Sequence, residues 1–136
     1  MTIQQISVFI ENKSGSMLQI LDMLKAQGIQ LLAVNIADTV EYGIFRIICS
    51  NPNKAYETLK EAKFSVALSE VFAIELNDEV GALADVLTIF RNEDISISYL
   101  YSFLLDGKGI MIFRTTDTEH TRDVIRQHGM RNLNLP

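Results

Sequence analysis

Residues 11–18, Glu-Asn-Lys-Ser-Gly-Ser-Met-Leu, form a polar turn between an apolar strand pattern and an amphipathic helix pattern. A turn of the same kind returns at residues 77–84, Asn-Asp-Glu-Val-Gly-Ala-Leu-Ala, again between a strand and a helix. Each turn carries one glycine, Gly15 and Gly81. Backbone NH groups at the start of a helix attract anions, and a carboxylate is one such anion. The sequence therefore predicts two similar turns, each able to hold a small acidic or zwitterionic ligand.

The residues around the first turn predict a β-α-β-β-α-β order for the first half of the chain. Ile6, Val8 and Ile10 share one face of a strand over 3–10, because side chains alternate with period two. Ser14 or Ser16 is expected to cap the helix that follows. The remaining elements expected in this half are a helix ended by Gly28, strands at 29–38 and 42–50, a helix with Asn51 or Ser50 as its cap and Pro52 in its first turn, and a strand at 64–68.

The second half repeats this order. Phe72, Ile74 and Leu76 alternate in the same way before the second turn. The elements expected after them are a helix marked by Leu83, Val86, Leu87 and Phe90, a strand at 95–105, a hairpin turn at 106–109, a strand at 110–115, a helix capped by Asp117 and ended by Gly129, and a weak strand at 130–135.

A constant offset along the chain relates the two halves. Gly15 and Gly81 are separated by 66 positions in the sequence, and so are Gly43 and Gly109. Two residues separated by this offset of 66 are called equivalent below. Duplication of one supersecondary unit explains the constant offset. We therefore predict an α+β fold of two units, 1–68 and 69–136, packed tightly because no Pro/Gly/Ser-rich linker separates them.

The composition is typical of a soluble globular protein, with 136 residues, 48% of them hydrophobic and 21% charged. The formal net charge of −5 argues against nucleic acid and against an anionic membrane surface as partners. Cys49 is the only cysteine and lies in an apolar strand pattern, which favours a buried, unreactive thiol. No apolar run reaches membrane-spanning length and the N-terminus does not read as a signal peptide, so we expect a cytoplasmic protein.

The duplicated β-α-β-β-α-β pattern with a strand-terminal Glu-Asn-x-x-Gly-x-x-Leu turn resembles the ACT domain family. The resemblance implies a ferredoxin-like fold repeated twice, with antiparallel sheets and helices on one face. It also implies that an amino acid binds between two units, one giving the turn and its neighbour the second strand. The positions that match this arrangement are Asn12, Ser14, Gly15, Ser16, Met17, Gln30 and Leu31 in the first half, and Asp78, Gly81, Ala82, Leu83, Ser96 and Ile97 in the second.

Two departures from the family pattern concern these positions. Ser14 and Val80 stand where the family often has a proline before the glycine, and Gln30 and Ser96 replace a frequent asparagine. Asp78 is suited to pair with an α-ammonium group. The alternative is that the two glycines only shape turns that Asp78 and its first-half counterpart Asn12 cap.

The sequence predicts no metal site and no catalytic site among the remaining polar side chains. His120 and His128 lie eight residues apart with no suitable partners, so we expect neither a metal nor a cofactor. No nucleophile with a base, or pair of carboxylates, suggests catalysis. Apolar residues on both faces of the strands, such as Phe9, Phe45 and Ile47, predict a covered second face and hence a homodimer.

The favoured function is a non-catalytic sensor of a free amino acid that regulates amino-acid metabolism, with an enzyme of that metabolism as a candidate partner. The alternative is a structural regulatory subunit of an amino-acid-biosynthetic enzyme, without a ligand of its own. A small enzyme on a ferredoxin-like scaffold is a third and weaker hypothesis. An apolar pocket floor would favour a hydrophobic amino acid, whereas Glu11, Asp78 or Glu79 would favour a basic one.

Overall fold

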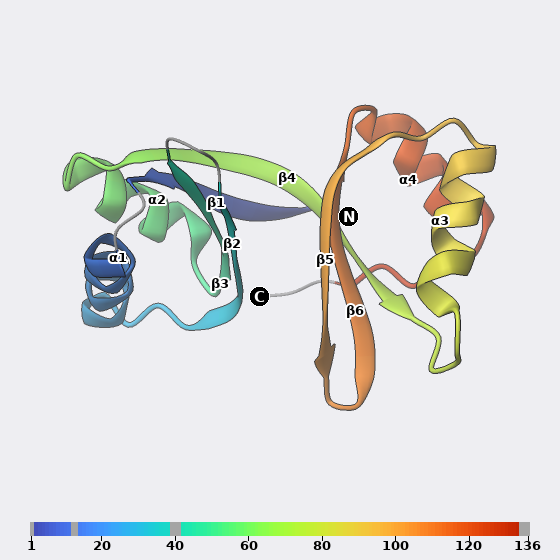
Figure 1. The fold of residues 1–136 in the computed structure, drawn as a ribbon, viewed down its shortest axis with the longest axis horizontal. Coiled ribbons are helices and arrows are strands. Elements are labelled where there is room, and N and C mark those ends of the chain that lie inside the picture. The colour runs from blue at the N-terminus through green and yellow to red at the C-terminus, as the bar shows by residue number, and fades with distance from the viewer. Residues whose placement is uncertain (1, 12–13, 39–41, 134–136) are drawn as a thin grey trace. The chain divides into compact units, whose positions relative to one another are not determined.

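A computed structural model describes residues 2–11, 14–38 and 42–133. Within these ranges it contains the expected succession of strands and helices, drawn in Figure 1. None of these helices is both long and apolar enough to span a membrane. In chain order the elements are β1 (Ile3–Ile10), α1 (Ser14–Ala26), β2 (Leu31–Asp38), β3 (Gly43–Cys49), α2 (Pro52–Glu61), β4 (Ser65–Leu76), α3 (Ala82–Asn92), β5 (Ile97–Leu105), β6 (Lys108–Thr115) and α4 (Thr118–Gln127).

The chain divides into two compact units, and the division falls within strand β4. The first unit comprises Gln4–Glu70, and the second begins at Val71. The hydrogen-bonded strand order is β2-β3-β1-β4-β6-β5. The sequence predicted separate strands at 64–68 and 70–76, but β4 is continuous because Ser69 and Glu70 stay extended. The boundaries 1–68 and 69–136 remain a prediction.

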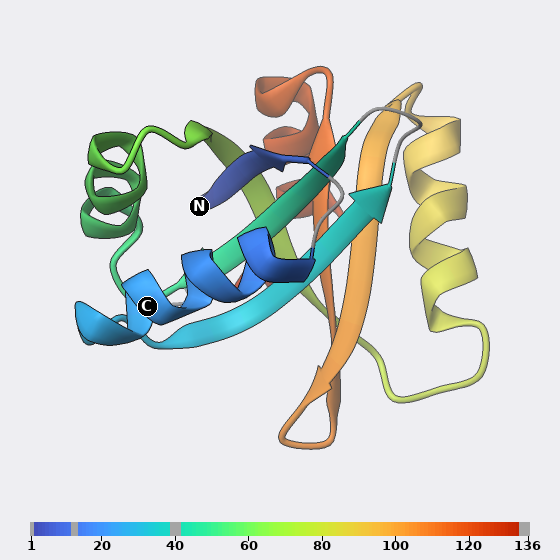
Figure 2. The same ribbon diagram turned by 60° about the vertical axis from the view of Figure 1, so that its left-hand side comes forward.

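In the first unit, α1 and α2 cover one face of the sheet, as Figures 1 and 2 both show. The inward positions of β1 and β3 meet Ile20 and Leu24 of α1 and Leu59 of α2. All of these side chains are buried, so this face carries the unit's hydrophobic core. The strand residues of this core are Ile6, Val8, Ile10, Phe45, Ile47 and Cys49.

The second unit builds its core from equivalent positions but uses aromatic rings. Phe113 of β6 is fully buried and lies between Phe72 and Phe90, with ring centroids 5.5 Å and 5.2 Å away. Val124 and Ile125 of α4 close the same cluster. The strand predicted at 130–135 is reduced to a single bridge between Asn132 and Ile74 in the part of it that the structure describes.

Strand pairing repeats between the units residue by residue. Ile10 pairs with Gly43 in the first unit, and the equivalent Leu76 pairs with Gly109 in the second. Every residue pair between β1 and β3 recurs at the equivalent positions of β4 and β6. Even the irregularity between Leu31 and Ala33 recurs between Ile97 and Tyr99. The predicted ferredoxin-like fold, repeated twice with antiparallel pairing, is therefore confirmed.

Helix starts differ from the prediction at one place. Helix α1 begins at Ser14, so Ser16 lies in its first turn and does not cap it. Asn51 and Asp117, which are equivalent, cap α2 and α4: Asn51 Oδ1 accepts from Lys54 N at 3.2 Å, and Asp117 Oδ1 accepts from His120 N at 3.0 Å. Residues 39–41, between the second and third predicted strands, lie outside the described residues.

Candidate functional site

The turn before α3 has the backbone conformation that suits an anion. Gly81 is the residue before the helix, its φ of 83° lies in the left-handed region, and no side chain caps the helix. Ala82 N already donates to the Glu79 carbonyl at 3.3 Å. The NH groups of Gly81 and Leu83 meet no acceptor among the described residues. These two NH groups are available to a carboxylate.

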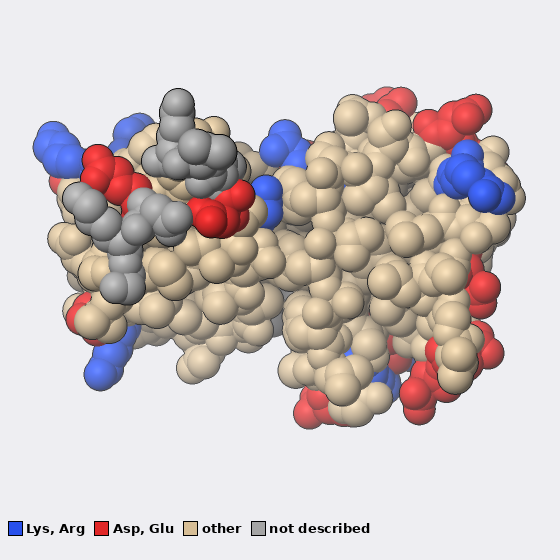
Figure 3. Space-filling view, viewed as in Figure 1, with Lys and Arg blue, Asp and Glu red and all other residues tan. Residues whose placement is uncertain are grey.

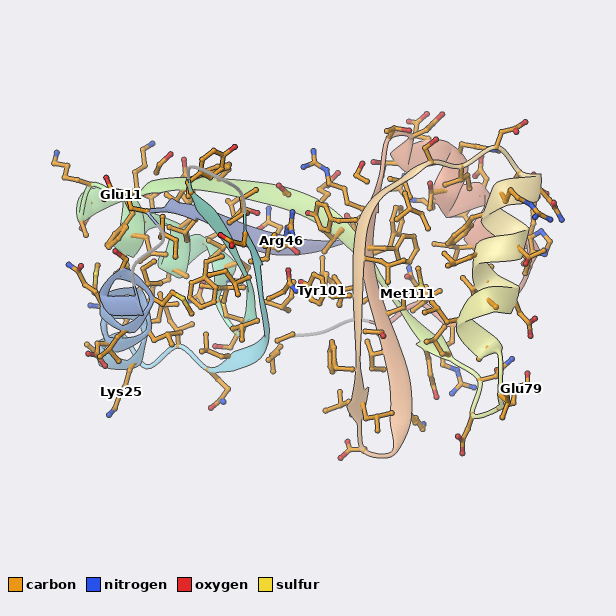
Figure 4. The ribbon with its side chains drawn as sticks, viewed as in Figure 1. Glu11, Lys25, Arg46, Glu79, Tyr101 and Met111 are labelled. Atoms are coloured by element: carbon orange, nitrogen blue, oxygen red, sulfur yellow. The ribbon has the colours of Figure 1, made fainter. Side chains whose placement is uncertain are left out.

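A pocket of about 630 Å³ opens beside this turn, within the second unit. Its volume falls in the range of small-molecule sites. Asp78 and Ala82, both predicted from the sequence, lie in its wall. Acidic side chains gather at the turn before α3 and at the tip of the β5–β6 hairpin (Figure 3), and Glu79 marks that turn in Figure 4. Ile74, Leu76, Val86, Ile89 and Met130 supply the pocket's apolar lining.

A group of three charged residues, absent from the predicted site, lies in the wall of the same pocket. The Glu75 carboxylate receives Arg131 Nη1 on one oxygen at 3.0 Å and Lys108 Nζ on the other at 3.5 Å. The Glu75 side chain is only 15% exposed, whereas those of Arg131 and Lys108 are 69% and 59% exposed. The ion pairs thus fix Glu75 and leave both cations facing solvent.

The first turn is described only in part. Asn12 and the side chain of Ser14 lie outside the described part of the chain. Gly15 is exposed in the first turn of α1, and Met17 packs against the core of the first unit. Gly15 also lines a hollow of about 450 Å³ along α1, with Ser16 outside it. This turn therefore differs from the second one, because its glycine lies inside a helix.

The second-strand positions lie at two further hollows. Gln30 and Leu31 line one of about 480 Å³, and Ser96 and Ile97 line one of about 490 Å³. All but one of the residues around the first hollow have their equivalents around the second. The Gln30 main chain is engaged with Ser50, donating to its Oγ at 3.0 Å and accepting from its NH at 2.9 Å.

Among the described residues of each unit, the turn and the second strand line separate hollows. Asp78 and Ala82 line one hollow of the second unit, and Ser96 and Ile97 line another. The same separation holds for Gly15 and the second-strand positions of the first unit.

The histidines and the cysteine have structural environments. His120 Nε2 lies 2.7 Å from the Glu93 carbonyl oxygen, and His128 Nε2 lies 3.6 Å from Glu93 Oε1, so both fasten α4 to the end of α3. Among residues 2–11, 14–38 and 42–133, no group of His, Cys, Asp and Glu is placed to hold a metal ion. Cys49 is 1% exposed, and burial raises the pKa of its thiol.

Two βαββαβ units in one chain, each with a glycine at the equivalent position near the start of its first helix, define a tandem pair of small α+β modules. A family model described as an ACT domain pair matches residues 1–134. The chain therefore belongs to the family of ACT domain pairs, which confirms the resemblance inferred from the turns. A search of curated proteins found no match.

Solved structures agree with this assignment. Protein BT0572 from Bacteroides thetaiotaomicron is 34% identical, with a TM-score of 0.92, and the match covers 98% of this chain and 92% of that one. The regulatory subunit of aspartate kinase from Thermus thermophilus has a TM-score of 0.65 at 13% identity, covering 93% and 90%. The corresponding subunit from Thermus flavus has a TM-score of 0.62 at 14% identity, covering 91% and 90%. The last two likenesses concern the fold alone.

Proposed function

We propose that this chain is a non-catalytic regulatory protein that binds a free amino acid at its strand–helix turns, between ACT units, and thereby regulates amino-acid metabolism. The observation that carries the proposal is the uncapped start of α3. There Asp78 and Ala82 line a pocket of about 630 Å³, and the NH groups of Gly81 and Leu83 meet no acceptor among the described residues. Membership of the ACT domain pairs and the likeness of fold to regulatory subunits support the same function.

A regulatory protein of this kind couples two binding events. The ligand stabilises one arrangement of the units, and that arrangement presents a different surface to a partner enzyme. Such coupling typically amounts to about 1–3 kcal/mol. We further propose a cytoplasmic homodimer, because the strands at the ends of the hydrogen-bonded order expose apolar side chains. Val34 of β2 is 49% exposed and Leu104 of β5 is 77% exposed. Light scattering coupled to size-exclusion chromatography measures the oligomeric state directly.

A thermal-shift panel of the twenty amino acids tests ligand binding. A ligand at 100 times its dissociation constant adds about 2.7 kcal/mol to the stability. At about 3–5 °C per kcal/mol for a chain of this size, the melting temperature should rise by about 8–13 °C. Flat melting temperatures with every amino acid, together with silent isothermal titration calorimetry, would reject the proposal.

Gly81→Asn separates binding at this turn from folding. Asparagine tolerates a left-handed φ better than other residues with a Cβ, so the fold should persist. Its side chain would nevertheless compete for the NH groups and obstruct close approach of a carboxylate. We expect an unchanged far-ultraviolet circular dichroism spectrum and at least tenfold weaker amino-acid binding. Unchanged affinity in a folded variant would place the ligand elsewhere.

A structural regulatory subunit without its own ligand is the second candidate. The observation in its favour is that the Ala82 NH is already engaged with the Glu79 carbonyl at 3.3 Å, which reduces the donors available to an anion. This candidate predicts that the chain co-purifies with a catalytic chain and that Gly81→Val leaves that association intact. Ligand-dependent association would contradict it.

A further inference from the structure

Strand β5 forms an open edge in the hydrogen-bonded strand order. It is the last strand of that order and pairs with β6 alone among the described residues (Figure 1). In the described part of the chain, the NH and C=O groups along its other edge therefore have no strand beside them. Such an edge accepts a further strand unless charged residues, prolines or bulges block the approach.

The sequence of β5 gives this edge little protection. The strand, Ile-Ser-Tyr-Leu-Tyr-Ser-Phe-Leu-Leu, contains neither a charged residue nor a proline. Its one irregularity, between Ile97 and Tyr99, affects only its start. Near its end, Leu104 is 77% exposed and Leu105 is 44% exposed. From Tyr99 onward, β5 is therefore a regular and uncharged edge with exposed apolar side chains.

Strand β2, at the other end of the order, differs from β5 at one decisive position. The residue equivalent to Leu104 is Asp38, which is charged and exposed. Although Val34 and Ile36 of β2 are also exposed, this edge ends in a carboxylate. Leu104 lies outside the hydrophobic core of the second unit, so packing within that unit does not account for a leucine there.

The regular part of β5 is suited to antiparallel pairing with its own copy. Residues directly opposite one another in an antiparallel pair lie on the same face of the sheet. A strand that pairs with its copy about a twofold axis therefore has one residue at the axis, with equal numbers paired on each side. The regular part of β5 runs from Tyr99 to Leu105, and its midpoint is Ser102. The pairs about this midpoint are Leu104 with Leu100, Phe103 with Tyr101, and Leu105 with Tyr99.

This register places both exposed leucines opposite large apolar side chains and brings no charges together. Strand β2 offers no such register, because its regular part has an even number of residues and hence no residue at its midpoint. A pairing centred on Asn35 places Asp38 opposite Leu32 of the copy. A pairing centred on Ile36 places Asp38 opposite Val34. Either one sets a carboxylate against an apolar side chain, which costs hydration of the charge.

We propose that β5 forms the interface of the homodimer, and that it pairs antiparallel with β5 of a second copy about an axis at Ser102. This inference rests on the proposed homodimer and assigns its interface to one strand. The second-unit sheets of the two copies join edge to edge, and the free NH and C=O groups of β5 gain partners. The exposed leucines are covered by the other copy. Because each copy uses the same strand, the assembly closes as a dimer.

Disulfide trapping on the full chain tests the register. Opposed residues of antiparallel strands have Cα atoms about 4.5–5.5 Å apart, a distance that a disulfide can span. Ser102→Cys places two thiols at the axis. Ser98→Cys is the matched control, because Ser98 is also exposed on β5 but lies opposite Asp106 in this register. The native Cys49 is buried, so it should not react. Non-reducing gel electrophoresis after mild oxidation measures the covalent dimer.

Lysine substitutions test which edge forms the interface. Leu104→Lys adds an edge charge to β5, and Val34→Lys adds the same charge to an exposed position of β2. Both side chains are exposed, so the fold should persist, and circular dichroism checks that it does. Light scattering coupled to size-exclusion chromatography then gives the mass of each variant beside that of the unmodified chain.

We expect a covalent dimer with Ser102→Cys and none with Ser98→Cys, and a monomer only with Leu104→Lys. A dimer that survives Leu104→Lys, or that is lost in Val34→Lys, would overturn this inference and leave the proposed homodimer standing. Failure of Ser102→Cys to cross-link, or equal cross-linking of both cysteine variants, would do the same. A monomeric unmodified chain would overturn both the inference and the homodimer. The proposed amino-acid binding is tested separately by the thermal-shift panel.

Discussion

The two turn glycines, which are equivalent in sequence, should respond to substitution with opposite signs. Gly81 has a φ of 83°, in the left-handed region that an L-residue with a Cβ adopts at a cost of about 1–2 kcal/mol. Gly15 lies in the first turn of α1 and has no positive φ. A Cβ added at either position meets nothing within 4 Å, so backbone conformation alone decides the outcome.

Gly81→Ala should therefore lower the free energy of unfolding by about 1–2 kcal/mol. Gly15→Ala should raise it by about 0.4–1 kcal/mol, because alanine restricts the unfolded chain at a site whose native conformation it can adopt. At about 3–5 °C per kcal/mol, the melting temperature should fall by about 3–10 °C in the first variant and rise by about 1–5 °C in the second.

Urea unfolding followed by circular dichroism, with tyrosine fluorescence as a second probe, measures both changes. Gly81→Asn is the matched control, because asparagine enters the left-handed region more readily and should lose less stability than alanine. A shift of the same sign in Gly15→Ala and Gly81→Ala would contradict the reasoning. So would a neutral Gly81→Ala, because the backbone at that turn could then not be left-handed.

Three further predictions concern the packing of the units. Asn51→Ala and Asp117→Ala each remove a helix cap and should each cost about 1 kcal/mol in urea unfolding; a neutral result at either position would mean that water replaces the cap. Burial raises the pKa of the Cys49 thiol, so the folded chain holds that proton more tightly than the unfolded chain. Stability should fall as the pH rises above about 8.5, and Cys49→Ala should lessen that fall; parallel pH profiles of the two proteins would disprove the assignment. Thr115 Oγ1 and Thr121 Oγ1 are buried 2.7 Å apart, and both lie within hydrogen-bond distance of the Asp117 carbonyl oxygen, so each single Thr→Val change should cost about 0.5–1.5 kcal/mol, and the double change less than their sum. Additive costs would exclude coupling between the two hydroxyls.

The sequence predicted the elements and their repetition, because these depend on local signals. Alternation marks β1, whose observed bounds Ile3–Ile10 are those expected, and the proline and capping residue before α2 fix its start. The predicted hairpin turn at 106–109 separates two stretches of strand-like sequence, so β5 and β6 could be predicted on either side of it. Periodicity and turn chemistry carry this information within a few residues of each element.

The candidate site was only partly predictable, because its wall joins segments far apart in the chain. Asp78 and Ala82 were found from the turn that contains them. Glu75 and Arg131 are distant in the sequence, and they meet because Glu75 N donates to the Arg131 carbonyl at 2.9 Å. That contact depends on the segment 130–135, where the sequence predicts only a weak strand. The conformation of Gly81 likewise depends on where α3 begins, which helical spacing leaves uncertain by a few residues.

In a duplicated chain, residues at equivalent positions of the two units can be compared, which a single domain does not allow. Cys49 of the first unit is equivalent to Thr115 of the second, and the Ala55 that lies in the same core is equivalent to Thr121. In the second unit the two buried hydroxyls lie 2.7 Å apart, and both also lie within hydrogen-bond distance of the Asp117 carbonyl oxygen, so each has a partner. In this case, two positions that both differ between the units carry side chains that are in contact in the second unit. The same comparison shows that the ionisable side chains around the second unit's pocket have uncharged residues at the equivalent positions of the first unit.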